Sequence, residues 1–134
     1  MKPIPVLATL CYNRGDLSIR MLQSIDYPIN KLVIVDNAVD ESIVAANDYA
    51  RSHFDNVVVF NPGFDKPNPV NLGFSGGFNW AIRHHMDDWI LLVGSDVQFH
   101  PGQLQLIFEY YEYHKKDSPP MGLVNTSYGW NVQG

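Results

Sequence analysis

Apolar residues fall into short uninterrupted runs along this chain, and the segments between the runs carry apolar residues at helical spacing. The runs lie at 4–11, 31–36, 56–60 and 89–93, with a shorter one at 121–124. An unbroken apolar run of this length predicts a strand buried on both faces, which is typical of a parallel sheet. The sequence therefore predicts five strands separated by helices.

Capping and breaking residues between the runs predict where the helices begin and end. Asp16 is expected to cap a first helix, which Pro28 closes, and Asp40 to open a second helix that reaches residue 54. A third helix is expected at 75–86, and a fourth with Pro101 in its first turn. This alternation predicts an α/β fold, a Rossmann-like, mostly parallel sheet flanked by helices on both faces.

The composition agrees with one globular domain. The chain has 134 residues, of which 46% are hydrophobic and 17% are charged, as in proteins that bury a core. Its formal net charge of −5 argues against a nucleic-acid partner, because surfaces that bind a nucleic-acid backbone are basic. A small phosphorylated ligand is compatible with this charge, since a metal ion and backbone amides offset negative charge locally.

Two further features concern the location of the protein. Cys11 is the only cysteine, so no intrachain disulfide forms and nothing indicates an oxidising compartment. No run approaches the ~18–20 apolar residues of a membrane span, so no integral membrane segment is expected. A cytoplasmic location is the resulting expectation.

Polar and aromatic residues follow the predicted strands, at the point where ligands bind in open parallel sheets. Tyr12 offers an aromatic face to a base, and Arg14 offers a positive charge. Asp36 offers acceptors for a base or a ribose, and Asp96 is the natural metal ligand. Considered singly, each residue has a simpler explanation. Asp36 and Asp96 can serve just to cap the loops after the strands, Tyr12 can serve just for packing, and Arg14 can be a solvated surface charge. Their joint position at strand ends favours a nucleotide site.

A glycine-rich segment, NLGFSGGFN at 71–79, lies at the start of the third predicted helix. Gly73 and the pair Gly76–Gly77 allow a positive φ or a close approach of the backbone to a ligand, and amides at a helix start attract anions. The spacing is neither the dinucleotide fingerprint nor a phosphate-binding loop with Gly-Lys-Ser/Thr. Tight packing of the helix on the sheet is the alternative explanation.

With these residues in view, the chain resembles the amino-terminal half of family 2 glycosyltransferases of the GT-A fold, especially the rhamnosyltransferase-like branch. The correspondence runs from residue 4 to residue 104. It rests on YNR at 12–14, VDN at 35–37, the glycine-rich segment at 71–79 and WILLVGSDVQFHPGQL at 89–104. The last two, in this order and spacing, are the specific ones.

The resemblance implies a domain that binds a UDP-, dTDP- or GDP-linked sugar for inverting transfer to a glycan, lipid or protein acceptor. It also implies that Asp96 binds Mn²⁺ or Mg²⁺, which acts as a Lewis acid toward the departing nucleoside diphosphate. The residues expected to bind the nucleotide are Leu10, Tyr12, Arg14, Asp36, Asn37, Asn71, Gly73, Gly76, Asn79, Ser95 and Asp96.

Two departures from the family pattern leave other functions open. The acidic motif is commonly Asp-x-Asp, and Gly94 stands at its first position. No Asp or Glu follows Asp117, whereas inverting members take their general base from the carboxyl-terminal half. Residues 1–134 are therefore expected to form one donor-binding domain that lacks the acceptor-binding part, with no catalytic residue assigned. The alternatives are a non-catalytic nucleotide-binding module and, less favoured, a nucleotidyltransferase.

Overall fold

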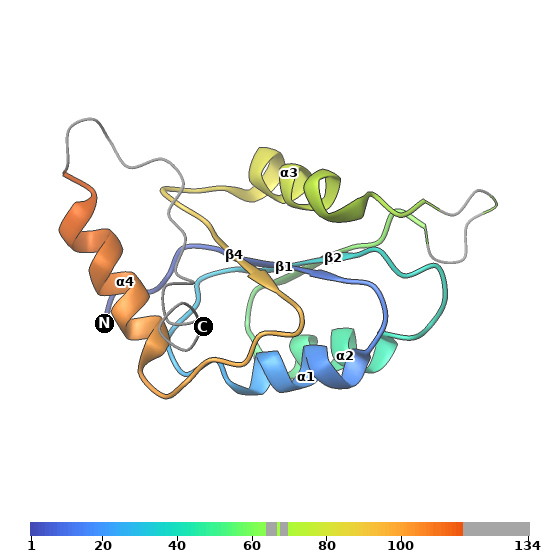
Figure 1. Ribbon diagram of the computed structural model, residues 1–134, viewed down its shortest axis with the longest axis horizontal. Coiled ribbons are helices and arrows are strands. Elements are labelled where there is room, and N and C mark those ends of the chain that lie inside the picture. The colour runs from blue at the N-terminus through green and yellow to red at the C-terminus, as the bar shows by residue number, and fades with distance from the viewer. Residues whose placement is uncertain (64–66, 68–69, 117–134) are drawn as a thin grey trace, which may run out of the picture.

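A four-stranded parallel sheet forms the centre of the protein (Figure 1). The computed structural model describes residues 1–63, 67 and 70–116, so the strand predicted at 121–124 lies outside the described residues. The sheet has the order β3-β2-β1-β4, with every neighbouring pair parallel, which confirms the predicted α/β fold. Its strands are β1 (Leu7–Cys11), β2 (Leu32–Asp36), β3 (Val57–Phe60) and β4 (Leu91–Gly94), and its helices are α1 (Gly15–Gln23), α2 (Val44–His53), α3 (Gly73–His85) and α4 (Gln103–His114).

The helices cover both faces of the sheet because successive strand residues point to opposite faces. Leu7 and Ile34 lie in the core cluster that α1, α2 and α4 share, on the lower face in Figure 1. Ala8 and Val35 belong to the second cluster, on the face that α3 covers. Burial on both faces is the reason why β1 and β2 have continuous apolar sequences.

All four helix starts differ from the sequence-based predictions, and α3 begins at Gly73 in place of residue 75. Helix α1 begins at Gly15 with no side-chain cap at Arg14, and Asp16 in its first turn accepts two hydrogen bonds from Arg14. Asp40 accepts the Ser42 N–H at 2.9 Å in a turn before α2, so that helix begins at Val44. Pro101 likewise precedes α4, whose first residue follows Gly102 with φ of +80°. Asp40 and Pro101 thus lie in turns before the helices to which the sequence assigned them, whereas Asp16 lies one residue inside α1.

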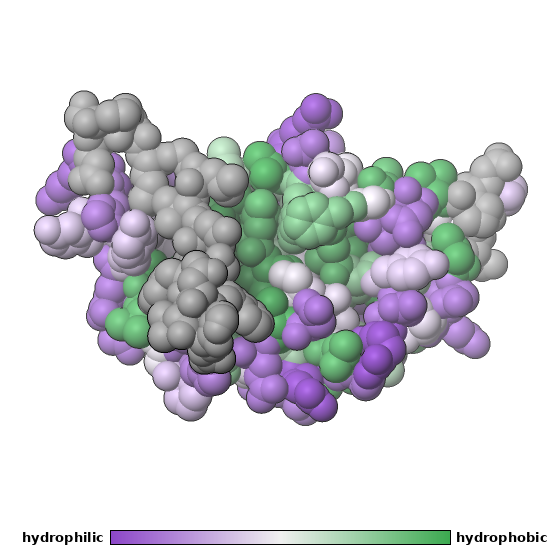
Figure 2. Space-filling model, viewed as in Figure 1, coloured by the Kyte–Doolittle hydropathy of each residue, from purple (hydrophilic) through white to green (hydrophobic). Residues whose placement is uncertain are grey.

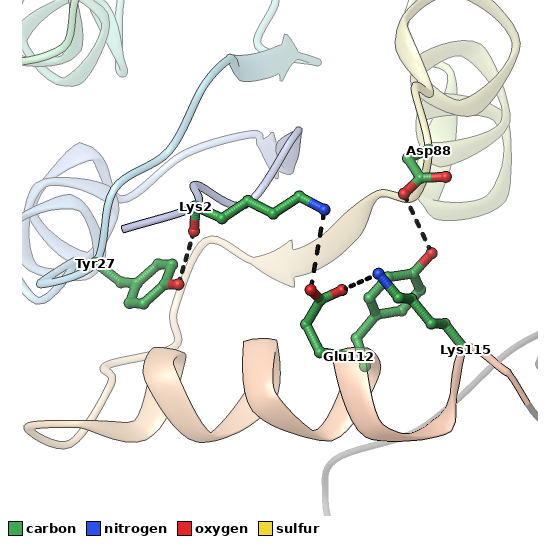
Figure 3. A network of polar contacts seen from close by, with 6 residues as sticks. Lys2, Tyr27, Asp88, Glu112 and Lys115 are labelled. Carbon is green, nitrogen blue, oxygen red and sulfur yellow. Dashed lines mark hydrogen bonds and ion pairs between the residues drawn. The ribbon is translucent and has the colours of Figure 1, made fainter.

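Polar contacts join α4 to the edge of the sheet at which β1 and β4 begin (Figure 3). Glu112 on α4 lies 2.8 Å from Lys115 and 3.9 Å from Lys2, and the Tyr111 hydroxyl lies 3.5 Å from Asp88. The hydrogen bond from Lys115 holds the pKa of Glu112 below its ordinary value. These contacts position α4 at the edge opposite the predicted site.

Hydrophobic side chains gather beside α3 on the face seen in Figure 2. There β4 is the outermost strand of the sheet on its side. Leu92 in β4 and Ile90 just before it are only half-buried. Helix α3 packs on β1 and β2, which leaves this part of the sheet less covered. Within the described residues, no helix combines the length and apolar character that crossing a bilayer needs.

Candidate functional site

The predicted nucleotide site lies where the four parallel strands end, which we call the C-terminal edge of the sheet. The register of the sheet aligns the residues there: Cys11 pairs with Asp36, and Leu10 pairs with Gly94. Tyr12 and Asp96 each lie two residues beyond that second pair. Both side chains are exposed, Tyr12 with 52% of its surface. The topology therefore brings the aromatic residue and the predicted metal ligand to neighbouring strand ends.

Asp36 occupies a different position, because its carboxylate is nearly buried. It is 5% exposed, and strand alternation directs its side chain to the face that α2 covers. Its Oδ1 accepts the Ala38 backbone N–H at 2.9 Å, and its Oδ2 accepts the Asn47 side-chain amide at 3.0 Å. The bond to Ala38 is the loop-capping role that the sequence left open. Each oxygen keeps a second lone pair for a ligand.

Asn37 joins the end of β2 to the start of α3. The residue is 4% exposed; its Oδ1 accepts the Leu72 N–H at 3.1 Å, and its Nδ2 donates to the Gly73 carbonyl at 3.3 Å. Its own N–H donates to the Cys11 carbonyl at 2.7 Å. The side chain that the sequence assigned to the nucleotide is thus bonded to the glycine-rich segment, so its effect on a ligand is to position that segment.

The glycine-rich segment has both a glycine with a positive φ and a glycine needed for tight packing of α3 on the sheet, the two explanations that the sequence offered. Gly73 has φ of +73°, and its N–H donates to Asn71 Oδ1 at 2.7 Å, so Asn71 stabilises the turn into α3. A Cβ at Gly77 would lie 2.5 Å from Leu10 Cδ2, so Gly77 is needed for packing. Gly76 is half-buried in the first turns of the helix. Leu10 contacts α3 with its side chain, and its main chain pairs with Val35 on one side and Gly94 on the other within the sheet.

Arg14 lies beside Tyr12 in an uncommon backbone conformation. Its φ of 60° and ψ of 57° are left-handed, and no other non-glycine residue of the described chain has a positive φ. Its guanidinium donates to both Asp16 oxygens, at 3.0 and 2.9 Å, and this pairing lowers the pKa of Asp16 to about 2. Such an exposed pair contributes little to stability, so Arg14 can exchange Asp16 for a phosphate at low cost.

Asp96 follows β4 in a turn with Ser95, where its exposed carboxylate lies above Gly94. A Cβ at Gly94 would lie 3.1 Å from Asp96 Oδ1. Within the described residues, no three His, Cys, Asp or Glu side chains are grouped to hold a metal ion. One carboxylate still suits a hard cation such as Mg²⁺, which proteins commonly bind through one or two carboxylates together with substrate phosphates.

Other candidate residues lie away from the C-terminal edge. Asn79 is exposed on α3, six residues or about 9 Å along the helix from Gly73, so the structure does not bring it to the strand ends. The acids Asp87 and Asp88 are exposed just before β4, at the opposite edge. A cavity of about 210 Å³ also lies at that opposite edge; its lining residues are Lys2, Pro3, Pro5, Asn30, Asp87, Asp88 and Trp89.

Sequence reasoning missed Asn47, which contacts Asp36 from the buried side of α2. Asn47 lies eleven residues from Asp36 in the chain, so the sequence around Asp36 does not predict the contact. One signal was available. An asparagine beside Ala46 and Ala50, at a position facing the sheet, is a polar residue where the helical pattern expects an apolar one.

Comparisons with known proteins agree with this architecture. The family model described as Glycosyl transferase family 2 matches residues 8–132. The crystal structure of S. aureus TarS 1-349 superposes with a TM-score of 0.65 at 18% identity, over 93% of this chain and 39% of that chain; at this identity the likeness concerns the fold. No curated protein matches the sequence. Because the family model covers nearly all of the chain, the protein belongs to glycosyl transferase family 2.

Proposed function

We propose that this domain binds the nucleoside-diphosphate sugar donor of an inverting glycosyltransferase, together with Mn²⁺ or Mg²⁺. The proposal is supported by the strand register, which brings the strand ends that carry Tyr12, Asp36 and Asp96 to one edge of a parallel sheet, in a chain of this family. Ligands of open parallel sheets bind at such an edge. The chain spans 39% of the TarS chain, so this function is that of a donor-binding part.

The base and the diphosphate have separate partners in this arrangement. Tyr12, exposed at the end of β1, provides a face on which a base stacks. Asp36 provides carboxylate oxygens that accept hydrogen bonds from the N–H groups of a base. Arg14 carries a positive charge that binds a phosphate bidentately once it leaves Asp16. Uracil, thymine and guanine all present the ring N–H that this carboxylate requires.

Asp96 is the residue that would hold the divalent cation, with the donor phosphates as the remaining ligands. Bound there, the cation supplies Lewis-acid stabilisation of the departing diphosphate. Asp96 stands alone because Gly94 has no side chain, so cation binding and donor binding should strengthen one another. We expect each to be weak in the absence of the other.

Calorimetric titration with UDP, dTDP and GDP, with and without Mn²⁺, tests the proposal. Mn²⁺ should tighten binding of at least one nucleotide, and Asp96→Asn should weaken the Mn²⁺-dependent binding about 10-fold or more, because even outer contacts of a metal site are worth this factor. Asp87→Asn is the matched control, since this exposed carboxylate lies at the opposite edge. If none of the three nucleotides binds, the proposal is wrong.

A nucleotide-binding module without transfer activity is the second candidate. Gly94 in the acidic motif favours it, as does the finding that the described residues offer no grouped metal ligands. It predicts nucleotide binding that neither Mn²⁺ nor Asp96→Asn changes. For either candidate we expect weak or no sugar transfer by residues 1–134 alone, because a general base must reach the acceptor hydroxyl and inverting members take that base from the carboxyl-terminal half.

A further inference from the structure

We propose that Asn47 is a positioning residue that fixes the orientation of the Asp36 carboxylate for base recognition. The inference rests on the proposed nucleotide site and adds a residue that does not contact the ligand. Its basis is the 3.0 Å hydrogen bond from Asn47 Nδ2 to Asp36 Oδ2, made between two side chains that are 6% and 5% exposed.

Asn47 is a polar residue on an otherwise apolar, buried side of α2, where its contact with Asp36 is the hydrogen bond that its side chain makes. The helix face that carries it is apolar, with Ala46, Ala50 and Ile43 each at most 1% exposed. Among the described residues, no donor reaches the buried Asn47 Oδ1. A buried polar atom without a partner lowers the stability of the fold, and an apolar side chain would avoid that penalty only by leaving Asp36 Oδ2 without its donor. The residue therefore opposes folding at one atom while it binds Asp36 with another.

The orientation of the Asn47 amide is determined by its partner. An ionised carboxylate only accepts hydrogen bonds, so the NH₂ group has to face Asp36 and the oxygen has to face away. The orphaned oxygen is thus a direct consequence of the bond to Asp36, and turning the amide over would put two acceptors together.

The Asp36 carboxylate accepts two hydrogen bonds, one on each oxygen, and both are needed to fix its orientation. The Ala38 N–H binds Oδ1 from the loop after β2, and Asn47 binds Oδ2 from α2. The terminal torsion of an aspartate is broad when it is unconstrained, so with Ala38 alone the carboxylate could still turn. With both bonds the remaining lone pairs have fixed directions, and a base meets acceptors that are already oriented.

Binding of UDP, dTDP, GDP and CDP to the full chain with Mn²⁺ tests the inference in wild type, Asn47→Leu and Thr9→Val. Leucine removes the donor and the orphaned oxygen at similar volume. Thr9→Val is the matched control, because Thr9 is 1% exposed and its hydroxyl also has no partner among the described residues. If the leucine variant does not fold, Asn47→Ala removes the amide without a longer side chain.

We expect Asn47→Leu to weaken binding of the preferred nucleotide about 3- to 10-fold, the factor for immobilising one side chain on binding. Tm should also fall, because Asp36 loses a buried hydrogen bond, so the change in nucleotide preference is the readout that separates positioning from stability. The affinity for CDP should change less, because cytosine has an acceptor nitrogen in place of the ring N–H. The ratio of the affinity for the preferred nucleotide to the affinity for CDP should therefore fall. Thr9→Val should change no affinity. Unchanged affinity in Asn47→Leu, or equal weakening of all four nucleotides, contradicts the inference. If wild type binds none of them, the proposed function is refuted and the inference with it.

Discussion

Replacing Asn37 with alanine should destabilise the start of α3 more than the rest of the protein. The substitution removes the bond from the Leu72 N–H at 3.1 Å and the bond to the Gly73 carbonyl at 3.3 Å. At about 1 kcal/mol for each net hydrogen bond, the loss is about 2 kcal/mol. For a domain between the small and medium size classes, this lowers Tm by roughly 6–8 °C.

Thermal unfolding followed by circular dichroism measures the total, and amide hydrogen exchange locates it. In Asn37→Ala, exchange of the amides around the first turn of α3 should accelerate by more than exchange in β1 and β2, since the lost bonds lie only at that end. Asn56→Ala is the control, because Asn56 is exposed and such substitutions change stability by about 0.5 kcal/mol or less. A Tm within 2 °C of wild type would refute the reasoning, as would exchange that is unchanged at α3.

Two further predictions concern packing and the single thiol. Gly77→Val should destabilise the fold by about 1–3 kcal/mol in urea titration, because a Cβ there would lie 2.5 Å from Leu10 Cδ2. The loss caused by Gly77→Val should be smaller in a Leu10→Ala background than in wild type, and an equal loss in both would exclude that clash as the cause. Burial raises the pKa of Cys11 from 9.0 to about 11, so iodoacetamide at pH 8 should label the unfolded chain and not the folded one. Between pH 9 and pH 11 the Cys11 thiol ionises in the unfolded chain and stays neutral in the folded one. The stabilisation that the buried thiol provides is therefore complete below pH 9 and is lost as the pH rises through 11. If the free energy of unfolding of wild type does not fall relative to Cys11→Ala over this range, the prediction is wrong.

The sequence predicted the sheet because the physical cause of each strand is local. Continuous apolar runs mark strands buried on both faces, and all four that lie in the described residues form strands. The first is shorter than predicted, since Ile4 makes only an isolated bridge with Ile29 before β1 begins. Parallel strands joined by helices also determine that the chain segments after them meet at one edge, so the position of Tyr12 and Asp96 at neighbouring strand ends follows from the sequence alone.

Helix starts were predicted less well, because a capping residue has competing partners nearby. Asp16 pairs with Arg14, and Asp40 bonds the N–H two residues ahead of it. Both contacts are local, yet propensity alone does not rank them against a cap. The residue types that favour a helix start also favour the turn before it.

What the sequence by itself determined is the order of the elements, the family and the set of polar residues that follow the strands. Only the tertiary structure decided what those residues do. Asp36 and Asn37 are adjacent in the chain, yet one binds α2 through Asn47 and the other binds the start of α3. The reason is that strand geometry sends neighbouring side chains to opposite faces, and the partner on each face comes from a distant segment that no local pattern identifies.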